Sequence, residues 1–210
     1  MKIKINSKEI KFTKGEKLIE VARRNNIEIP ALCYAADYQH QPSCMVCIVK
    51  DLTSNQIIPS CSTLAAKGME IETDSEEVKQ LRTISLELLL SDHIAVCRPP
   101  CEPATCKLRQ YANLYRAKRN KYPRYSAIET TLPQYVKDNL WFDVTKCIRC
   151  GLCVYNSKDG FTFKERGFAM QVVLPEESVA NVDKSLWEIC PTQALTIRLS
   201  KFSLLSYAKL

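Results

Sequence analysis

Short alternating runs of apolar and polar residues open the chain. KIKIN and EIKFTK alternate as the two strands of a hairpin do, with the turn at Ser7 and Lys8. The next segment, EKLIEVARRNN, places its apolar residues on one face of a helix. Two β-branched runs, VCIVKD and QIIPSC, predict a further pair of strands. Residues 1–73 are therefore expected to form a small α+β unit.

A longer helical pattern follows. Asp74 and Ser75, with two acidic residues after them, supply the cap and first turn of a helix that should run to about residue 91. Five residues recur at helical spacing and predict its buried face: Val78, Leu81, Ile84, Ser85 and Leu88. After a turn broken by prolines, ATCKLRQYANLYRAKR predicts a second helix. Residues 74–119 are thus expected to be a helical unit.

The last part of the chain, residues 120–210, predicts a linker and a third unit. Residues 120–139 have no steady period and serve best as a connector. From Trp141 onward the pattern predicts a cysteine-containing turn, a short helix, strands over FTFKER and MQVVLP, a helix over SLWEIC and a closing strand over ALTIRL. The fold class expected for the whole chain is α+β in three units.

Composition places this chain among soluble globular proteins, with 46% apolar and 25% charged residues. The N-terminal residues lack the apolar core of a secretory signal, and no run approaches membrane-spanning length. We therefore expect the protein in the cytoplasm. In that reducing compartment dense cysteines indicate metal ligands or redox groups rather than structural disulfides.

The eleven cysteines fall into three groups with none left over. The first group is Cys33, Cys44, Cys47 and Cys61, the middle group is Cys97, Cys101 and Cys106, and the last group is Cys147, Cys150, Cys153 and Cys190. An iron–sulfur cluster takes four protein ligands. Two groups are therefore complete, and His93 could supply the ligand that the middle group lacks.

Spacing within the first group is C-x10-C-x2-C-x13-C. Four thiolates suit either a [2Fe–2S] cluster or a zinc ion. Zinc ribbons usually have two tight C-x2-C pairs, whereas this group has one. The pattern favours iron–sulfur and leaves zinc as the alternative.

The spacing in the last group is a stronger indication of a cluster site, because C-x2-C-x2-C points three thiolates at one centre. Ser157 occupies the position where two-cluster ferredoxins have a fourth cysteine. Cys190, which is followed by a proline, must then complete the site across 36 intervening residues. We expect a single [4Fe–4S] cluster here.

At these motifs the chain resembles a known family. IPALCYAADYQHQPSCMVCIVKD, with the PSC that ends at Cys61, resembles the N-terminal iron–sulfur region of the large iron–sulfur subunit of complex I. The same region occurs in the diaphorase small subunit of NAD-reducing hydrogenases and in the N-terminal region of iron-only hydrogenases. ICPTQALTI resembles the segment that closes its last cluster site. The resemblance implies a β-grasp domain whose four cysteines bind [2Fe–2S].

His93-x3-Cys97-x3-Cys101-x4-Cys106 resembles the one-histidine, three-cysteine [4Fe–4S] ligand set of the same family. The family pattern is H-x3-C-x2-C-x5-C, so here the central cysteine comes one residue late. The alternative for His93 is an ordinary capping or surface histidine, whose partly positive ring is favoured at a helix C-terminus. His40 lies in a loop between ligands and is expected to be solvated.

Five glycines give neither a dinucleotide fingerprint nor a phosphate loop, so we expect no NAD or flavin site. With two histidines a cysteine nucleophile is a poor alternative, and we expect no catalytic site. The resemblance implies an electron-transfer subunit of a cytoplasmic NAD(P)H-linked complex, of the hydrogenase, formate dehydrogenase, transhydrogenase or complex I-like kind. It would relay single electrons between a flavin/NAD(P)-binding subunit and a further redox subunit of a hetero-oligomer, through one [2Fe–2S] and two [4Fe–4S] clusters.

Positive charge is concentrated in residues 98–124, which contain eight basic residues and one acidic residue and so account for the net charge of +7. Such a segment could dock onto an acidic partner, form a solvated face, or bind single-stranded nucleic acid through its interleaved tyrosines. The last possibility gives the alternative function, a zinc-binding interaction module that uses this stretch on nucleic acid. A stand-alone redox enzyme is disfavoured because the sequence shows no substrate or cofactor pocket.

Overall fold

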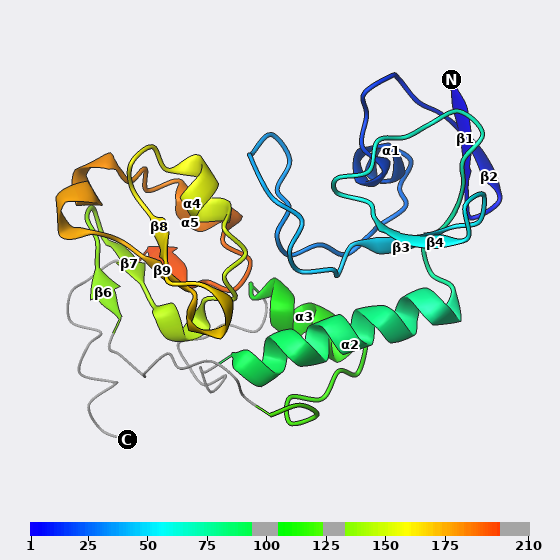
Figure 1. The fold of residues 1–210 in the computed structure, drawn as a ribbon. Coiled ribbons are helices and arrows are strands. Elements are labelled where there is room, and N and C mark those ends of the chain that lie inside the picture. The colour runs from blue at the N-terminus through cyan, green and yellow to red at the C-terminus, as the bar shows by residue number, and fades with distance from the viewer. Residues whose placement is uncertain (94–104, 124–132, 198–210) are drawn as a thin grey trace.

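The computed structural model describes residues 1–93, 105–123 and 133–197. Its helices and strands are described below as three units (Figure 1). Figure 1 shows the sheet of β1–β5 on one side, the strands β6–β10 on the other, and the helices α2 and α3 running below them. Cys97 and Cys101, two of the predicted ligands, lie outside the described residues.

A five-stranded mixed sheet forms the first unit. Its strands are β1 (Lys2–Ile5), β2 (Lys8–Lys11), β3 (Ile48–Asp51), β4 (Gln56–Pro59) and β5 (Glu70–Glu72), in the order β2-β1-β5-β3-β4. The predicted hairpin of β1 and β2 is confirmed, with left-handed backbone at Asn6 and Ser7 in its turn. β1 and β5 are parallel, and the other neighbouring strands are antiparallel.

Helix α1 (Leu18–Arg24) packs its apolar face into the core of this sheet. The amides of Leu18 and Ile19 donate to the carbonyl oxygens of Thr63 and Ser60, at 2.9 and 3.1 Å. These bonds use amides that a helix start leaves without intrahelical partners. They also fix the segment that contains Cys61 against the helix.

The sequence analysis missed β5, which is the central strand. Its three residues are too few for a period-2 pattern to stand out. Its position comes from pairing with β1 on one side and β3 on the other. Long-range pairing of this kind is invisible to local patterns.

The second unit contains α2 (Glu76–Asp92) and α3 (Lys107–Leu114). The predicted start of α2 is confirmed, because the Ser75 hydroxyl accepts from the Val78 amide at 3.5 Å. The predicted buried face is wrong apart from Val78. Ile84 and Leu88 are 41% and 46% exposed, and the residues that are buried on α2 are Val78, Arg82, Leu86, Glu87 and Leu90. Apolar residues of α2 lie on several sides of the helix, so the elements that pack against it determine which side is buried.

The third unit has a three-stranded sheet in the order β10-β7-β6, formed by β6 (Gln134–Tyr135), β7 (Leu140–Phe142) and β10 (Leu195–Ile197). A separate ribbon joins β8 (Thr162–Lys164) to β9 (Gln171–Val173), and the short helices are α4 (Leu152–Asn156) and α5 (Leu186–Ile189). The predicted short helix, ribbon and closing strand are confirmed. β7 was not expected, and β6 lies inside the predicted connector.

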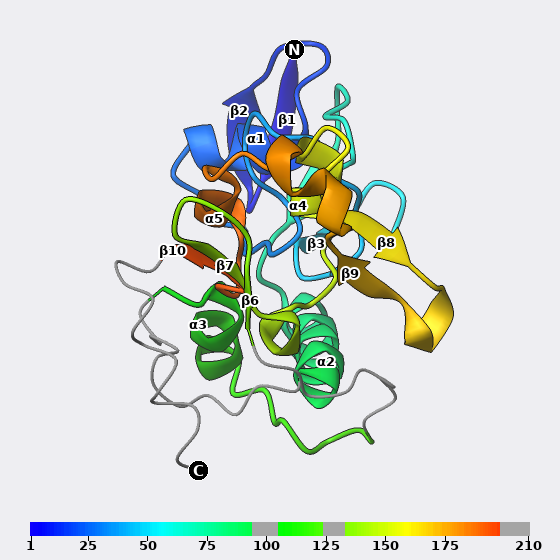
Figure 2. The same cartoon turned by 90° about the vertical axis from the view of Figure 1, so that its left-hand side faces the viewer.

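Apolar packing joins the three units. One of its clusters takes residues from every unit: Leu32, Cys33, Cys44, Val46, Leu86, Leu90, Cys106, Leu108, Ala112 and Ile148. Figure 2 shows α2 and α3 lying side by side below the third unit. We call this cluster the central core. In the described part of the chain, no helix is long and apolar enough to cross a membrane.

The central core gives the first testable prediction. Leu86→Ala should lower the free energy of unfolding by about 3 kcal/mol, because Leu86 is fully buried and its truncation leaves a cavity. Leu88→Ala, on the same helix but 46% exposed, is the matched control and should change it by less than about 0.5 kcal/mol. Anaerobic urea denaturation followed by circular dichroism measures both. Equal losses of unfolding free energy in the two variants would contradict the finding that α2 buries Leu86 and exposes Leu88.

Candidate iron–sulfur sites

The first cysteine group converges in the interior, as the spacing predicted. Cys33 and Cys44 come from the loop after α1, Cys47 immediately precedes β3, and Cys61 follows β4. All four side chains are buried, none more than 6% exposed, and the Sγ atoms of Cys33 and Cys44 are 3.3 Å apart. The fold therefore brings four sulfur ligands together in an apolar setting.

Hydrogen bonding among these thiols shifts their pKa values in opposite directions. A bond from Cys44 lowers the pKa of Cys33 and raises that of Cys44. A bond from Cys61 lowers the pKa of Cys47 to about 7, and bonds with Cys33 and then with Cys47 raise the pKa of Cys61. These bonds connect all four thiols. Metal binding replaces such protons, because the thiolate is the ligand.

The first group offers four buried thiols as donors. Among the described residues, no group of three or more histidine, cysteine, aspartate or glutamate side chains is arranged to hold a single metal ion. Four thiolates shared among the irons of a cluster place only one or two on each iron. The donor set and its burial fit a cluster of this kind.

His40 is not solvated, contrary to the expectation. It is partly buried, its Nε2 lies 3.0 Å from the Cys61 carbonyl oxygen, and its ring meets Tyr34 edge-on at 4.8 Å. The loop that contains it folds back over the last ligand of the first group. Local sequence offered no signal for this contact, which joins residues 21 positions apart.

The last cysteine group also comes together. Cys147 ends a 3₁₀ turn (Val144–Lys146), Cys150 and Cys153 lie at the start of α4, and Cys190 caps the end of α5. Backbone amides of Arg149 and Leu195 donate to the sulfurs of Cys147 and Cys190, both at 3.4 Å. A small cavity lies among all four cysteines and is otherwise lined mainly by apolar side chains.

Desolvation in this apolar setting raises the pKa of Cys147 to about 12 and raises those of Cys150 and Cys153. Thiolates here need compensating positive charge, which bound iron would supply. The tight turn itself depends on left-handed backbone at Arg149 and Gly151. Donor chemistry and shape therefore fit a four-thiolate cluster at this group as well.

Only His93 and Cys106 of the middle group are described. His93 ends α2 as its C-cap residue, is 5% exposed, and its Nδ1 has no hydrogen-bond partner among the described residues. Burial, and then the charge of Arg119, lower its pKa to about 4, so the ring is neutral at neutral pH. The surface alternative with a partly positive ring is therefore wrong. A buried neutral imidazole with a free nitrogen fits a metal ligand.

The last group has neighbours in both of the other groups. Cys150 packs against the central core that contains Cys33 and Cys44. The Lys107 amide, directly after Cys106, donates to the Pro191 carbonyl, directly after Cys190, at 2.8 Å. The last group therefore adjoins both the first group and the described part of the middle group.

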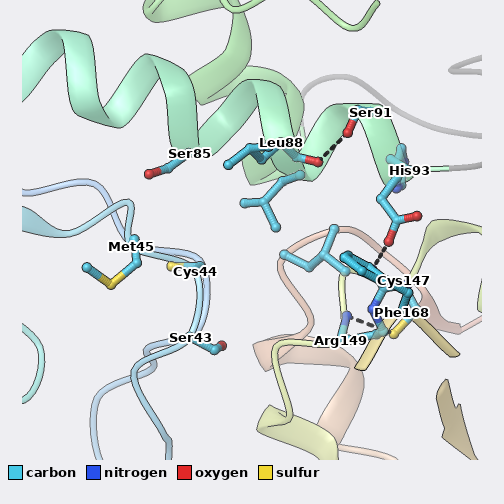
Figure 3. A pocket seen from close by; sticks show the side chains of 13 residues that line it. Ser43, Cys44, Met45, Ser85, Leu88, Ser91, His93, Cys147, Arg149 and Phe168 are labelled. Atoms are coloured by element: carbon cyan, nitrogen blue, oxygen red, sulfur yellow. Dashed lines mark hydrogen bonds and ion pairs between the residues drawn. The ribbon is translucent and has the colours of Figure 1, made fainter. Parts of the chain in front are cut away.

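A pocket of about 310 Å³ opens where the three units meet (Figure 3). Its lining includes one candidate ligand from each group, namely Cys44, His93 and Cys147. Arg149 forms an ion pair with Asp92, the residue before His93, and this pair links the last cysteine turn to the end of α2. Figure 3 shows Arg149 beside Cys147 and across from the end of that helix. The pair fixes the last site against the middle one.

Two family models match the chain. A 2Fe–2S iron–sulfur cluster binding domain matches residues 1–76, and a 4Fe–4S single cluster domain matches residues 140–197. The chain thus has a 2Fe–2S domain and a 4Fe–4S domain in a mixed α/β structure, as expected for its first and last units. The middle helices lie outside both matches.

Similar proteins confirm the family resemblance. The chain is 26% identical over 203 residues to a subunit of an NADH-quinone oxidoreductase of Rhizobium meliloti (strain 1021), covering 93% of this chain and 24% of the relative. It is 27% identical over 160 residues to the putative formate dehydrogenase YrhE of Bacillus subtilis (strain 168), and this match covers 72% of this chain and 16% of the relative. The chain therefore spans at most about a quarter of the length of these two relatives.

A solved structure shares the fold. It is a chain of an NAD⁺-reducing [NiFe]-hydrogenase in the H₂-reduced state, with a TM-score of 0.82 and 24% identity. The match covers 96% of this chain and 89% of the other. All three units of the described fold are therefore shared with one existing protein chain.

Gly151 gives a prediction for the last site. Its φ is +78°, and an added Cβ would lie 2.6 Å from the Tyr155 ring and 3.1 Å from the Phe163 ring. Gly151→Ala should cost about 3 kcal/mol of stability, from left-handed strain plus overpacking, and reduce the iron bound by the last group. Gly15→Ala is the matched control, since its φ is +93° with nothing within 4 Å of the added Cβ, and should cost about 1 kcal/mol without iron loss. Equal losses of stability and of iron in the two variants would show that the added Cβ at Gly151 is not crowded by the two rings.

The Asp92–Arg149 ion pair gives another prediction. Asp92→Asn should lower stability by about 2 kcal/mol, because it leaves a largely buried guanidinium without its carboxylate. Asp74→Asn breaks the more exposed pair with Lys79 and should cost less than about 0.5 kcal/mol. Chemical denaturation of both variants provides the comparison. A negligible loss for Asp92→Asn would show that the pair does not hold the two elements together.

Proposed function

We propose that this chain is the iron–sulfur electron-transfer subunit of a multi-subunit cytoplasmic NAD(P)H-linked oxidoreductase. The observation that supports this most is the convergence of the first and last cysteine groups in the interior, close to the buried His93 and Cys106. The curated relatives, which include subunits of NADH-quinone oxidoreductase, support the same class. When bound, the clusters would accept and donate single electrons, which no side chain of this chain does by itself.

The cofactors that we propose are one [2Fe–2S] and two [4Fe–4S] clusters. The first group would hold [2Fe–2S], supported by the match of a 2Fe–2S domain to residues 1–76. The last group would hold one [4Fe–4S], supported by the single-cluster domain match to residues 140–197. The middle group, His93 with Cys97, Cys101 and Cys106, would hold the second, supported by the buried neutral ring of His93.

The finer fold that we propose for the first unit is a β-grasp. A mixed sheet with parallel β1 and β5 flanked by antiparallel strands, and with α1 packed against it, supports this assignment. The sheet holds two of the four sulfurs at strand ends, and the loop after α1 supplies the others. The protein's contribution to electron transfer is thus to bury, orient and separate the ligand groups.

The partners that we propose are a flavin- and NAD(P)-binding subunit and a further redox subunit. A carrier of single electrons needs a partner that converts the two-electron chemistry of NAD(P)H into one-electron steps. The basic stretch would dock onto an acidic face of such a partner, and its exposed Lys107, Arg116 and Lys118 support that use. Arg119, in the same stretch, also holds the end of α2 by donating to the His93 carbonyl at 2.8 Å.

Iron and sulfide analysis of protein purified without oxygen tests the proposal. We expect about ten irons per chain, two in the first site and four in each of the others. Cys44→Ser should remove about two of them, with the paramagnetic signal of the reduced [2Fe–2S] cluster, and Cys147→Ser about four. Colourless protein that contains zinc, or an iron count near two, would reject the proposal. Zinc with salt-sensitive nucleic-acid binding would favour the alternative module.

A further inference from the structure

The buried face of α2 contains a charge that the proposed function does not use. Arg82 is 1% exposed and is the largest fully buried side chain of the described structure. It lies on the face of α2 that is buried in the structure, one turn before Leu86 of the central core. A long cationic side chain is almost never fully buried unless it has a partner, so this position needs an explanation.

The guanidinium of Arg82 joins the elements of two ligand groups. Its Nη2 donates to the Ile48 carbonyl oxygen at 2.7 Å, and Ile48 directly follows Cys47 of the first group. Its Nη1 donates to the Tyr115 hydroxyl at 2.9 Å, and Tyr115 ends α3, the helix that begins just after Cys106. Arg82 is therefore hydrogen-bonded to the residue that follows Cys47 of the first group and to the end of the helix that follows Cys106 of the middle group.

Neutral oxygens are its only described hydrogen-bond acceptors. Among residues 1–93, 105–123 and 133–197, no carboxylate lies within 4.0 Å of the Arg82 nitrogens, and its Nε has no partner. The Tyr115 ring lies 5.9 Å from the guanidinium carbon and offers a weak cation–π contact. A buried cation with only neutral partners is costly, which indicates that a negative charge is to be found nearby in the working protein.

We propose that Arg82 is the counter-cation of the first cluster and raises its reduction potential. This inference rests on the proposed function. Four thiolates and two sulfides outweigh two ferric ions, so the loaded first site is anionic and becomes more so when it accepts an electron. A fixed positive charge stabilises the reduced form more than the oxidised form. Net charge around a cluster is one of the factors that set its potential.

The test is a redox titration of the first cluster, followed by its paramagnetic signal, in the full chain with its partners as purified. In Arg82→Gln the ratio of reduced to oxidised cluster at the wild-type midpoint should fall about tenfold, a shift of about 59 mV for a one-electron couple. In an effective dielectric constant of about 20, a unit charge about 12 Å away has an effect of this size. Arg82→Lys keeps the charge and should keep the ratio within about threefold.

A second pair of variants, at Tyr115, changes the charge beside the guanidinium and leaves Arg82 itself in place. Tyr115→Glu places a carboxylate against the guanidinium and should lower the same ratio, whereas Tyr115→Gln, which has the same length without the charge, should not. Arg24→Gln removes an exposed cation that is paired with Glu16, and it controls for total charge. Its ratio should equal that of the wild type.

Unchanged ratios in both Arg82→Gln and Tyr115→Glu would overturn the inference, as would equal shifts in Tyr115→Glu and Tyr115→Gln. If Arg82→Gln does not accumulate, the Tyr115 pair decides alone. A wild-type chain without a reducible [2Fe–2S] signal would instead reject the proposed function, so the two failures are distinct.

Discussion

The packing of sulfur ligands into one shared apolar core is the contact on which the rest of the structure depends. Cys33 and Cys44 from the first unit, Cys106 from the second and Ile148 from the third meet against Leu86 of α2. The first and third units also have apolar cores of their own, and the shared cluster attaches all three units to one another. The same packing places residues of the three ligand groups near one another.

Charges inside this interior follow from its function as a ligand site. Thiols removed from water resist ionisation, as the raised pKa of Cys147 shows. Cationic side chains sit close to the ligands: Arg82 beside the strand after Cys47, Arg119 on the His93 carbonyl, and Arg149 within the last cysteine turn. Bound iron and these cations together would compensate the thiolates. Structures with many sulfur ligands need such compensation wherever solvent is excluded.

Local sequence patterns predicted most of the elements and failed where packing chose between equivalent options. The β1–β2 hairpin and the Ser75 cap were correct, because turn and cap chemistry act within a few residues. The predicted face of α2 was wrong apart from Val78, because leucines occur on several sides of this helix and the buried side includes Arg82 and Glu87. Strand β5 and the contact of His40 with Cys61 were missed, because each depends on partners far along the chain.

The sequence by itself indicated which side chains could bind metal and how they are grouped, since ligand type and short spacings such as C-x2-C are local properties. It also predicted most of the helices and strands, but not β5, β6 or β7. The tertiary structure alone decided that Cys33, Cys44, Cys106 and Cys150 pack against one core, and that Arg82 is buried. These features depend on which surfaces exclude water against one another, and that free energy belongs to residues that are distant in sequence and adjacent in space.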